Sequence, residues 1–184
     1  MQFMSINRIV LVLIAALTAF GGAAEAASKA KIDRRVDKAL TEFRDDIGGA
    51  DAVLARAVGV LVFPSVKKAG IGIGGEYGEG ALRIGGKSVA YYNTAAASIG
   101  FQLGAQARRQ IIVFLDQKAL DKFRSSEGWE IGVDASVAVV TLGAGGAIDT
   151  TTLDQPIVAF IFDNKGLMYN LSLEGSKISR IHDD

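Results

Sequence analysis

Few side chains in this sequence are placed to carry out acid–base or nucleophilic chemistry. His182 is the only histidine and lies two residues before the end of the sequence, which does not suit a catalytic triad or a histidine-based zinc site. There is no cysteine, so disulfides, thiol nucleophiles and cysteine-based metal sites are excluded. The carboxylate pairs Glu76 with Glu79 and Asp134 with Asp149 suit turns and solvated surface as well as acid–base work. We therefore expect no enzymatic activity, metal or cofactor, although a carboxylate-only calcium site stays open.

Two stretches have the appearance of phosphate-binding loops. Residues 70–75 match G-x-G-x-x-G, and residues 81–88 approach the P-loop pattern with Ala81 in place of its first glycine. Both motifs require a helix N-terminus after the glycines, which directs backbone amides at phosphate. Here the first stretch lies inside a strand-like pattern and the second lies on a Gly85–Gly86 turn. The sequence therefore favours a closely packed strand and a hairpin over a nucleotide site.

A cluster of cations near residue 30 has the composition of an anion-binding surface. The cluster consists of Lys29, Lys31, Arg34, Arg35 and Lys38. Lys67 and Lys68 form a second basic pair. One interpretation is a solvated helix face whose cations are offset by Asp33 and Asp37. The other is a helix that lies on an anionic lipid surface, with basic edges and an inserted apolar stripe.

An amphipathic helix over residues 28–47 is the element that must position the first cluster. Its apolar residues recur at helical spacing. They are Ile32, Val36, Ala39, Leu40, Phe43 and Ile47. Gly48 and Gly49 are expected to end this helix, and Asp51 to cap a second short helix that runs through Arg56.

Strand-like patterns follow the helices. Residues 59–63 are apolar and β-branched, and we expect Pro64 to end this strand. Glycines of one parity run from Gly70 to Gly80 with Glu76 among them, so one face of that strand is nearly bare backbone. Such a face lets another segment pack very close to it, or lets the strand bend.

The rest of the sequence predicts a sheet and one more helix. The Gly85–Gly86 pair predicts a hairpin turn. Further strands are expected over residues 88–93, 98–104 and 110–116, an alternating segment over 131–142, and a last hairpin from 157–162 and 167–173 around a turn at 163–166. Residues 117–125 predict a short helix with Ala119, Leu120 and Phe123 inward. The fold class is α+β, with N-terminal helices before a mainly antiparallel, glycine-rich sheet that curls toward a barrel.

The first 26 residues have the pattern of a secretory signal peptide. Arg8 precedes an apolar run over residues 9–20, and small residues lead to an A-x-A site that ends at Ala26. Cleavage there leaves one domain over residues 27–184, in the periplasm or secreted, and an uncleaved anchor is the alternative. No cysteine is present for attachment of a lipoprotein anchor. The balance of 20 basic against 20 acidic residues argues against nucleic-acid binding.

Several stretches together resemble the SYLF domain family, in its stand-alone bacterial branch. They are residues 59–70, 72–80, 92–93, 100–106, 132–140, 162–168 and 173–176, spread over about residues 30–181. The resemblance implies phospholipid binding through a basic N-terminal amphipathic helix, which by position holds the cations between Lys29 and Lys38. In eukaryotic relatives it also implies phosphoinositides and actin, which are not expected ligands in a bacterial periplasm.

Two functions follow as hypotheses. The first is an exported lipid-binding domain that docks reversibly on phospholipid surfaces through the basic helix, with Lys67 and Lys68 flanking the same surface. The alternative is a non-catalytic structural or protein-interaction module of the cell envelope, which self-associates or binds a partner through exposed strand edges.

Overall fold

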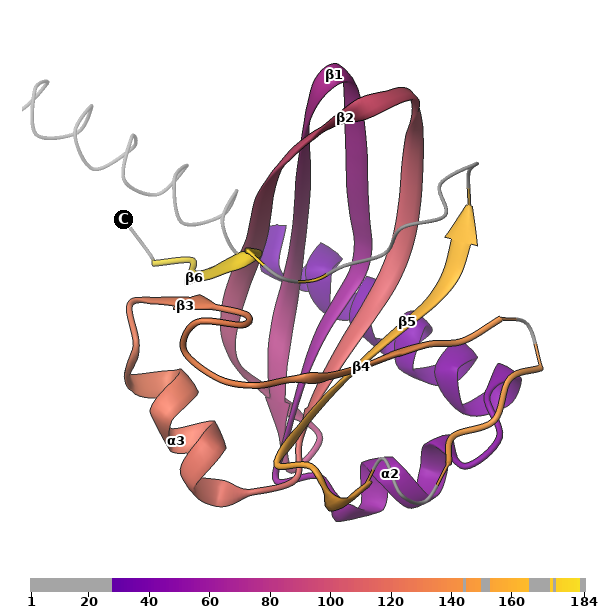
Figure 1. Ribbon diagram of the computed structural model, residues 1–184. Coiled ribbons are helices and arrows are strands. Elements are labelled where there is room, and N and C mark those ends of the chain that lie inside the picture. The colour runs from indigo at the N-terminus through magenta and orange to yellow at the C-terminus, as the bar shows by residue number, and fades with distance from the viewer. Residues whose placement is uncertain (1–27, 144, 150–152, 166–172, 174, 183–184) are drawn as a thin grey trace, which may run out of the picture.

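The structure is a computed structural model that describes residues 28–143, 145–149, 153–165, 173 and 175–182. The predicted signal peptide and most of the predicted strand over 167–173 lie outside these residues. Helices and a curled, mainly antiparallel sheet make up the described part, so the predicted α+β class is confirmed (Figure 1).

Six described strands form one sheet in the order β3-β6-β2-β5-β4, with β1 on β2. Their bounds are Gly59–Ile84 for β1, Lys87–Phe114 for β2, Gly128–Glu130 for β3, Ala138–Thr141 for β4, Ile157–Lys165 for β5 and Lys177–Arg180 for β6. All pairings are antiparallel except β4 with β5, which is parallel. Of the predicted alternating segment over 131–142, only β4 is a strand. β5 pairs with β2 and β4 among the described residues, instead of only with a following strand.

β1 and β2 form one long ribbon that bends back on itself. Gly85 and Gly86 have φ of 57° and 79° and close the predicted hairpin turn, with Ile84 opposite Lys87. The three strands expected between residues 88 and 116 are one continuous β2. Both strands rise to the top of the molecule and descend again (Figure 1), and a register shift lies between Gly70 and Gly72 near this bend.

Bare glycine backbone lets the two halves of β1 meet. A Cβ atom on Gly80 would lie 2.0 Å from the carbonyl oxygen of Val62, and one on Gly78 would lie 2.8 Å from that of Ser65. The predicted close approach is thus confirmed at these two positions. The expectation that Pro64 ends the first strand is wrong, because β1 continues through it. A register shift between Phe63 and Val66 relaxes the ladder there, where a residue without an N–H is tolerated.

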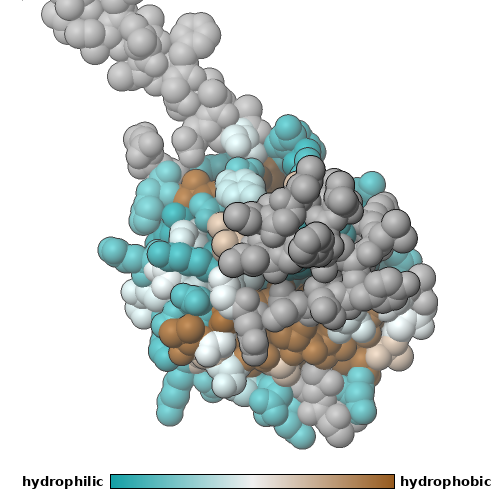
Figure 2. Space-filling model, turned by 45° about the horizontal axis from the view of Figure 1, so that its top comes forward, coloured by the Kyte–Doolittle hydropathy of each residue, from teal (hydrophilic) through white to brown (hydrophobic). Residues whose placement is uncertain are grey.

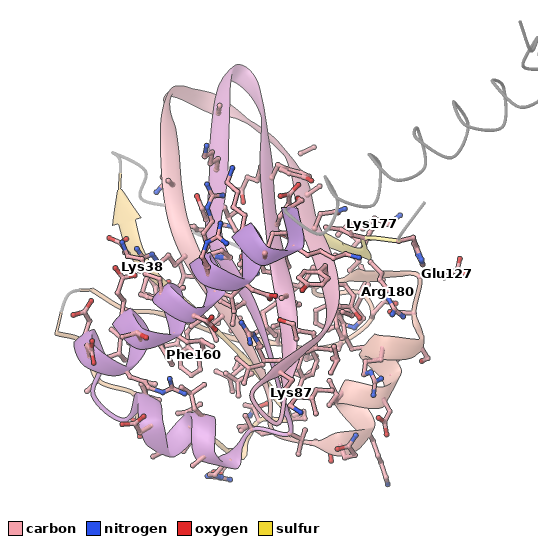
Figure 3. All side chains as sticks on the ribbon, turned by 180° about the vertical axis from the view of Figure 1, so that it is seen from behind. Lys38, Lys87, Glu127, Phe160, Lys177 and Arg180 are labelled. Carbon is pink, nitrogen blue, oxygen red and sulfur yellow. The ribbon has the colours of Figure 1, made fainter. Side chains whose placement is uncertain are left out.

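Helices cover both faces of the sheet. The N-terminal helix (residues 28–46) and α2 (Ala50–Arg56) pack on one face, and α3 (Gln117–Ser125) packs on the other. In Figure 3, Phe160 lies under the N-terminal helix, and its ring centroid is 5.4 Å from that of Phe43. Leu120 and Phe123 of α3 are buried and Ala119 is partly buried, as predicted.

The junction between the N-terminal helix and α2 differs from the sequence prediction in one respect, the residue that caps α2. Gly49, with φ of 84°, is the N-cap of α2 and makes no side-chain capping hydrogen bond. Asp51 therefore does not cap α2 as expected. It lies in the first turn of α2, and its carboxylate is 3.4 Å from Nε of Arg44. The change arises because Gly49 takes a left-handed conformation, so the chain leaves the first helix and enters the second directly.

Candidate anion-binding site

The apolar stripe of the N-terminal helix is part of the protein core. Ile32 is 7% exposed, and Val36 and Phe43 are fully buried against β-strand residues such as Val62 and Phe160. Inserting this stripe into a lipid layer would require removal of the helix from the sheet. The expectation of an inserted stripe is therefore wrong, and any docking by this helix must use its polar side.

The acidic residues of the helix face the sheet on one flank of the stripe. Asp33 accepts hydrogen bonds from the Ser88 hydroxyl at 2.6 Å and from the Tyr91 hydroxyl at 2.9 Å. Asp37 pairs with Nη2 of Arg83 at 2.6 Å, and Asp33 lies 3.6 Å from the same nitrogen. Both carboxylates thus engage side chains of β1 and β2, and no ion pair joins either of them to Lys31, Arg34, Arg35 or Lys38 among the described residues.

The cations of the helix lie mainly on its other sides. At 100° per residue, Lys31, Arg35 and Lys38 fall on the flank opposite the Asp33–Asp37 flank. These three and Arg34 are exposed, whereas Lys29 is half-buried with Nζ 5.6 Å from the centroid of the Tyr91 ring. Among the four exposed cations, Lys38 lies 3.9 Å from the carboxylate of Glu42.

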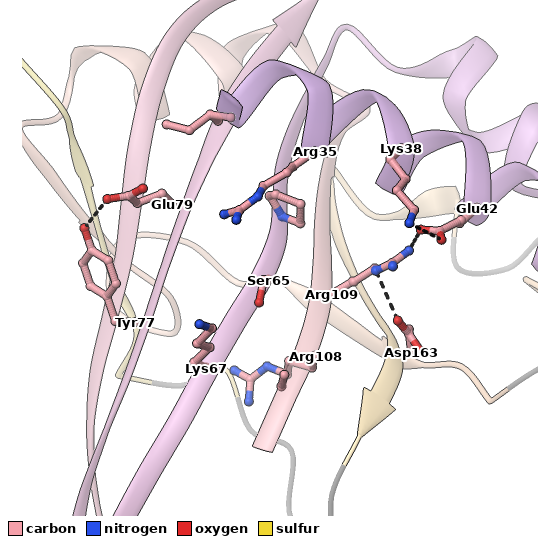
Figure 4. A pocket seen from close by; sticks show the side chains of 13 residues that line it. Arg35, Lys38, Glu42, Ser65, Lys67, Tyr77, Glu79, Arg108, Arg109 and Asp163 are labelled. Carbon is pink, nitrogen blue, oxygen red and sulfur yellow. Dashed lines mark hydrogen bonds and ion pairs between the residues drawn. The ribbon is translucent and has the colours of Figure 1, made fainter. Parts of the chain in front are cut away.

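A cavity of about 480 Å³ lies between this basic flank and the β1–β2 ribbon (Figure 4). Among the described residues, its lining includes five cations and three carboxylates. They are Arg35, Lys38, Lys67, Arg108 and Arg109 with Glu42, Glu79 and Asp163. The lining thus has an excess of two positive charges, which favours an anion.

A network of ion pairs forms one side of the cavity. Arg109 pairs with Glu42 of the helix and, through Nε at 3.2 Å, with Asp163 of β5. Asp163 has a left-handed φ of 49°, a conformation that aspartate tolerates better than most residues. This network joins the N-terminal helix to β2 and β5, and its two carboxylates neutralise the charge of Arg109.

The two lysines predicted to flank the basic surface differ in role. Lys67 is exposed and lines the cavity. Lys68 points to the other face of β1, where its Nζ is 3.2 Å from Oε1 of Glu76 and its side chain is 14% exposed. Glu76 is also paired with the buried Arg108 at 2.6 Å. The structure therefore brings Lys67 together with Arg35 and Lys38, and it places Lys68 in an internal ion cluster.

Glu76 and Glu79, one of the carboxylate pairs considered in the sequence, lie in different surroundings. Glu76 is buried, whereas Glu79 is exposed and accepts a hydrogen bond from the Tyr77 hydroxyl at 3.0 Å. Burial first, and then the hydrogen bond and charge of Glu79, raise the pKa of Tyr77. Asp134 accepts from the backbone N–H of Glu130 at 2.6 Å. Within the described part of the chain, no three His, Asp or Glu side chains gather as metal ligands.

Sequence reasoning missed Arg108, Arg109 and Asp163 as parts of this site. The two adjacent arginines are visible in the sequence. Only the structure of β2 shows that Arg108 pairs with Glu76 inside the ribbon, while Arg109 pairs with Glu42 of the N-terminal helix.

None of the described helices has the length and apolar character needed to cross a membrane.

The comparisons point to one family. The family described as Ysc84, Las17-binding protein actin regulator, matches residues 95–184, from the middle of β2 onward. No curated protein matches the chain. The matched segment contains the strands that complete the curled sheet behind the glycine-rich ribbon. The match over residues 95–184 is consistent with the SYLF domain family, to which the Ysc84 description belongs and which the sequence resembles.

Proposed function

We propose that the chain is an exported domain that docks reversibly on anionic phospholipid surfaces through the cations of its N-terminal helix. The match to the SYLF family suggests a lipid-binding or actin-related interaction module. The observation that carries the lipid proposal is the separation of charge on the helix. Asp33 and Asp37 are paired with the sheet, so Lys31, Arg34 and Arg35 face outward without an ion-pair partner among the described residues.

Docking of this kind is peripheral. The apolar stripe stays in the core, so attraction comes from cations near the head groups, at about 1 kcal/mol for each one. Four exposed cations on one helix are enough for reversible attachment. Because such charges are solvated, added salt is expected to weaken the attachment.

Charge reversal on the helix tests this proposal. The triple variant Arg34→Glu, Arg35→Glu, Lys38→Glu should sediment less with vesicles of phosphatidylcholine and phosphatidylglycerol than the unaltered protein. A matched control is Lys118→Glu, Arg124→Glu, Lys177→Glu, which makes the same charge change at exposed positions of α3 and β6. Equal sedimentation of the helix variant and the unaltered protein would show that the helix is not the docking surface.

Export is proposed from the signal-peptide pattern of residues 1–26. Expression of the full sequence in a bacterial host should release a periplasmic protein that begins at Ala27. N-terminal sequencing of the periplasmic fraction measures this directly. Recovery of a chain that still begins at Met1 would argue for the uncleaved anchor instead.

A protein-interaction role is the second candidate. β4 lies at one end of the strand order and exposes Val139 by 42%, and Val133 nearby in sequence is 74% exposed. Figure 2 shows hydrophobic residues gathered in a band across the lower half of one face. An apolar edge of this kind suits pairing with another chain. Light scattering after size exclusion distinguishes the candidates, because this role requires self-association or a protein partner and no vesicle binding.

A further inference from the structure

The cavity beside the N-terminal helix contains cations that its ion pairs do not use. Arg108 is paired with Glu76, while Arg109 and Lys38 share Glu42 and Asp163. The third lining carboxylate, Glu79, accepts the hydrogen bond of Tyr77. Arg35 and Lys67 remain, and no ion pair involves either of them within the described part of the chain.

These two cations reach the cavity from different elements. Arg35 comes from the N-terminal helix above the cavity, and Lys67 comes from β1 below it (Figure 4). Ser65 lies two residues before Lys67 in the same strand and also lines the cavity, so its hydroxyl is on the same side. Both cations are exposed, so an anion can enter from solvent without displacement of the core.

We propose that this cavity binds the terminal phosphate of a phosphomonoester, with the Arg35 guanidinium and the Lys67 ammonium as its charged ligands and the Ser65 hydroxyl as a further donor. The inference rests on the proposed docking on phospholipid and specifies the head group that is preferred. A phosphomonoester carries close to two negative charges and three terminal oxygens at neutral pH. Its charge therefore suits Arg35 and Lys67, the two lining cations that make no ion pair among the described residues, and its oxygens match two cationic donors from opposite walls.

A phosphodiester head group fits the same cavity less well. It carries one negative charge, and both of its ester oxygens are substituted, so fewer terminal oxygens can face the two walls at once. The carboxylates of Glu42, Glu79 and Asp163 around the cavity also repel any anion that is not drawn in by both cations. The cavity thus discriminates by charge and by the number of terminal oxygens.

The test compares vesicles of phosphatidylcholine that contain equal mole fractions of phosphatidic acid, a phosphomonoester, or phosphatidylglycerol, a phosphodiester. The unaltered protein should bind the phosphatidic acid vesicles more tightly. Arg35→Gln and Lys67→Gln should each weaken binding to phosphatidic acid by about tenfold, the loss expected for one charge-assisted hydrogen bond. Both variants should then bind the two kinds of vesicle about equally.

Lys31→Gln and Arg34→Gln are the matched controls, because these cations are exposed on the same helix but do not line the cavity. They should weaken binding to both vesicles by the same factor and keep the preference. Inorganic phosphate and glycerol phosphate, added to the phosphatidic acid vesicle assay as competitors, separate the sources of the phosphate. If either soluble phosphate reduces vesicle binding at a concentration too low to change the Debye length, charge screening is not the cause. The result then supports a phosphate site that also accepts soluble ligands.

The outcomes separate this inference from the proposed function. Equal binding of the unaltered protein to both vesicles would overturn the phosphomonoester site and leave general docking intact. Retention of the preference in Lys67→Gln and Arg35→Gln would also overturn it. Absence of binding to either vesicle would contradict the docking function itself.

Discussion

Glu76 and Arg108 form an ion pair inside the bent β1–β2 ribbon, with 2.6 Å between Oε2 of the carboxylate and Nη2 of the guanidinium. The side chains of Glu76 and Arg108 are 8% and 3% exposed, and Nζ of Lys68 is 3.2 Å from the same carboxylate. One acid therefore compensates two cations in a region poor in water. This arrangement makes Glu76 a stability-determining residue of the ribbon.

Replacement of Glu76 by Gln should destabilise the protein by about 3 kcal/mol, because it leaves a buried guanidinium without its counter-ion. Urea unfolding followed by circular dichroism measures the change. Glu79→Gln is the control, since Glu79 lies three residues away in the same strand but is exposed. If Glu76→Gln and Glu79→Gln unfold at the same urea concentration, the ion pair contributes little.

Gly80 should not tolerate a side chain. The new Cβ of Gly80→Ala would overlap the carbonyl oxygen of Val62 at 2.0 Å, and this atom belongs to backbone that cannot rotate away. We expect a loss of about 3 kcal/mol, at the upper end of the cost of overpacking. In Gly75→Ala the nearest contact of the new Cβ is an ordinary 3.8 Å, so the unfolding midpoint should change little. Similar thermal midpoints for the two variants would contradict the close approach of the two halves of β1.

Asp33 should act as the attachment point of the basic helix. Asp33→Ala removes the hydrogen bonds from Ser88 and Tyr91 and an ion pair with Arg83, at a cost of about 2 kcal/mol. Amide hydrogen exchange should become faster in residues 28–46, measured by mass spectrometry. Asp45→Ala, an exposed change on the same helix, should leave both quantities nearly unaltered. Unchanged exchange in Asp33→Ala would mean that apolar packing alone holds the helix.

Stability should decrease at high pH through Tyr92. Burial raises the pKa of this hydroxyl above its usual 10.0, and the nearby charges of Arg180 and Arg124 oppose the shift. Above pH 10 the unfolded chain loses this proton while the folded chain keeps it, so the free energy of unfolding falls as the pH rises further. Urea midpoints between pH 8 and pH 11 measure the fall, which should be smaller in Tyr92→Phe. Identical pH profiles for the two proteins would exclude this contribution.

Local patterns in the sequence predict the regular elements well. The spacing of Ile32, Val36 and Phe43 determines a helix with one buried face, because that period matches the helical turn. Gly85 and Gly86 determine the hairpin, because both need positive φ in the turn that joins twisted strands. The parity of Gly78 and Gly80 indicates a close approach, although it does not identify the partner segment.

Positions that depend on distant parts of the chain were decided only by the tertiary structure. The bend of the β1–β2 ribbon places Arg108 against Glu76, which is 32 residues earlier, and so withdraws Lys68 from the surface. The same bend brings Lys67 under Arg35, while Arg83 and Tyr91 take up the helix carboxylates. Sequence determined which residues are charged and which face of each element is apolar, because these follow from residue type and period. Only the packed fold decided which charges neutralise one another, since ion pairing depends on distances set by long-range contacts.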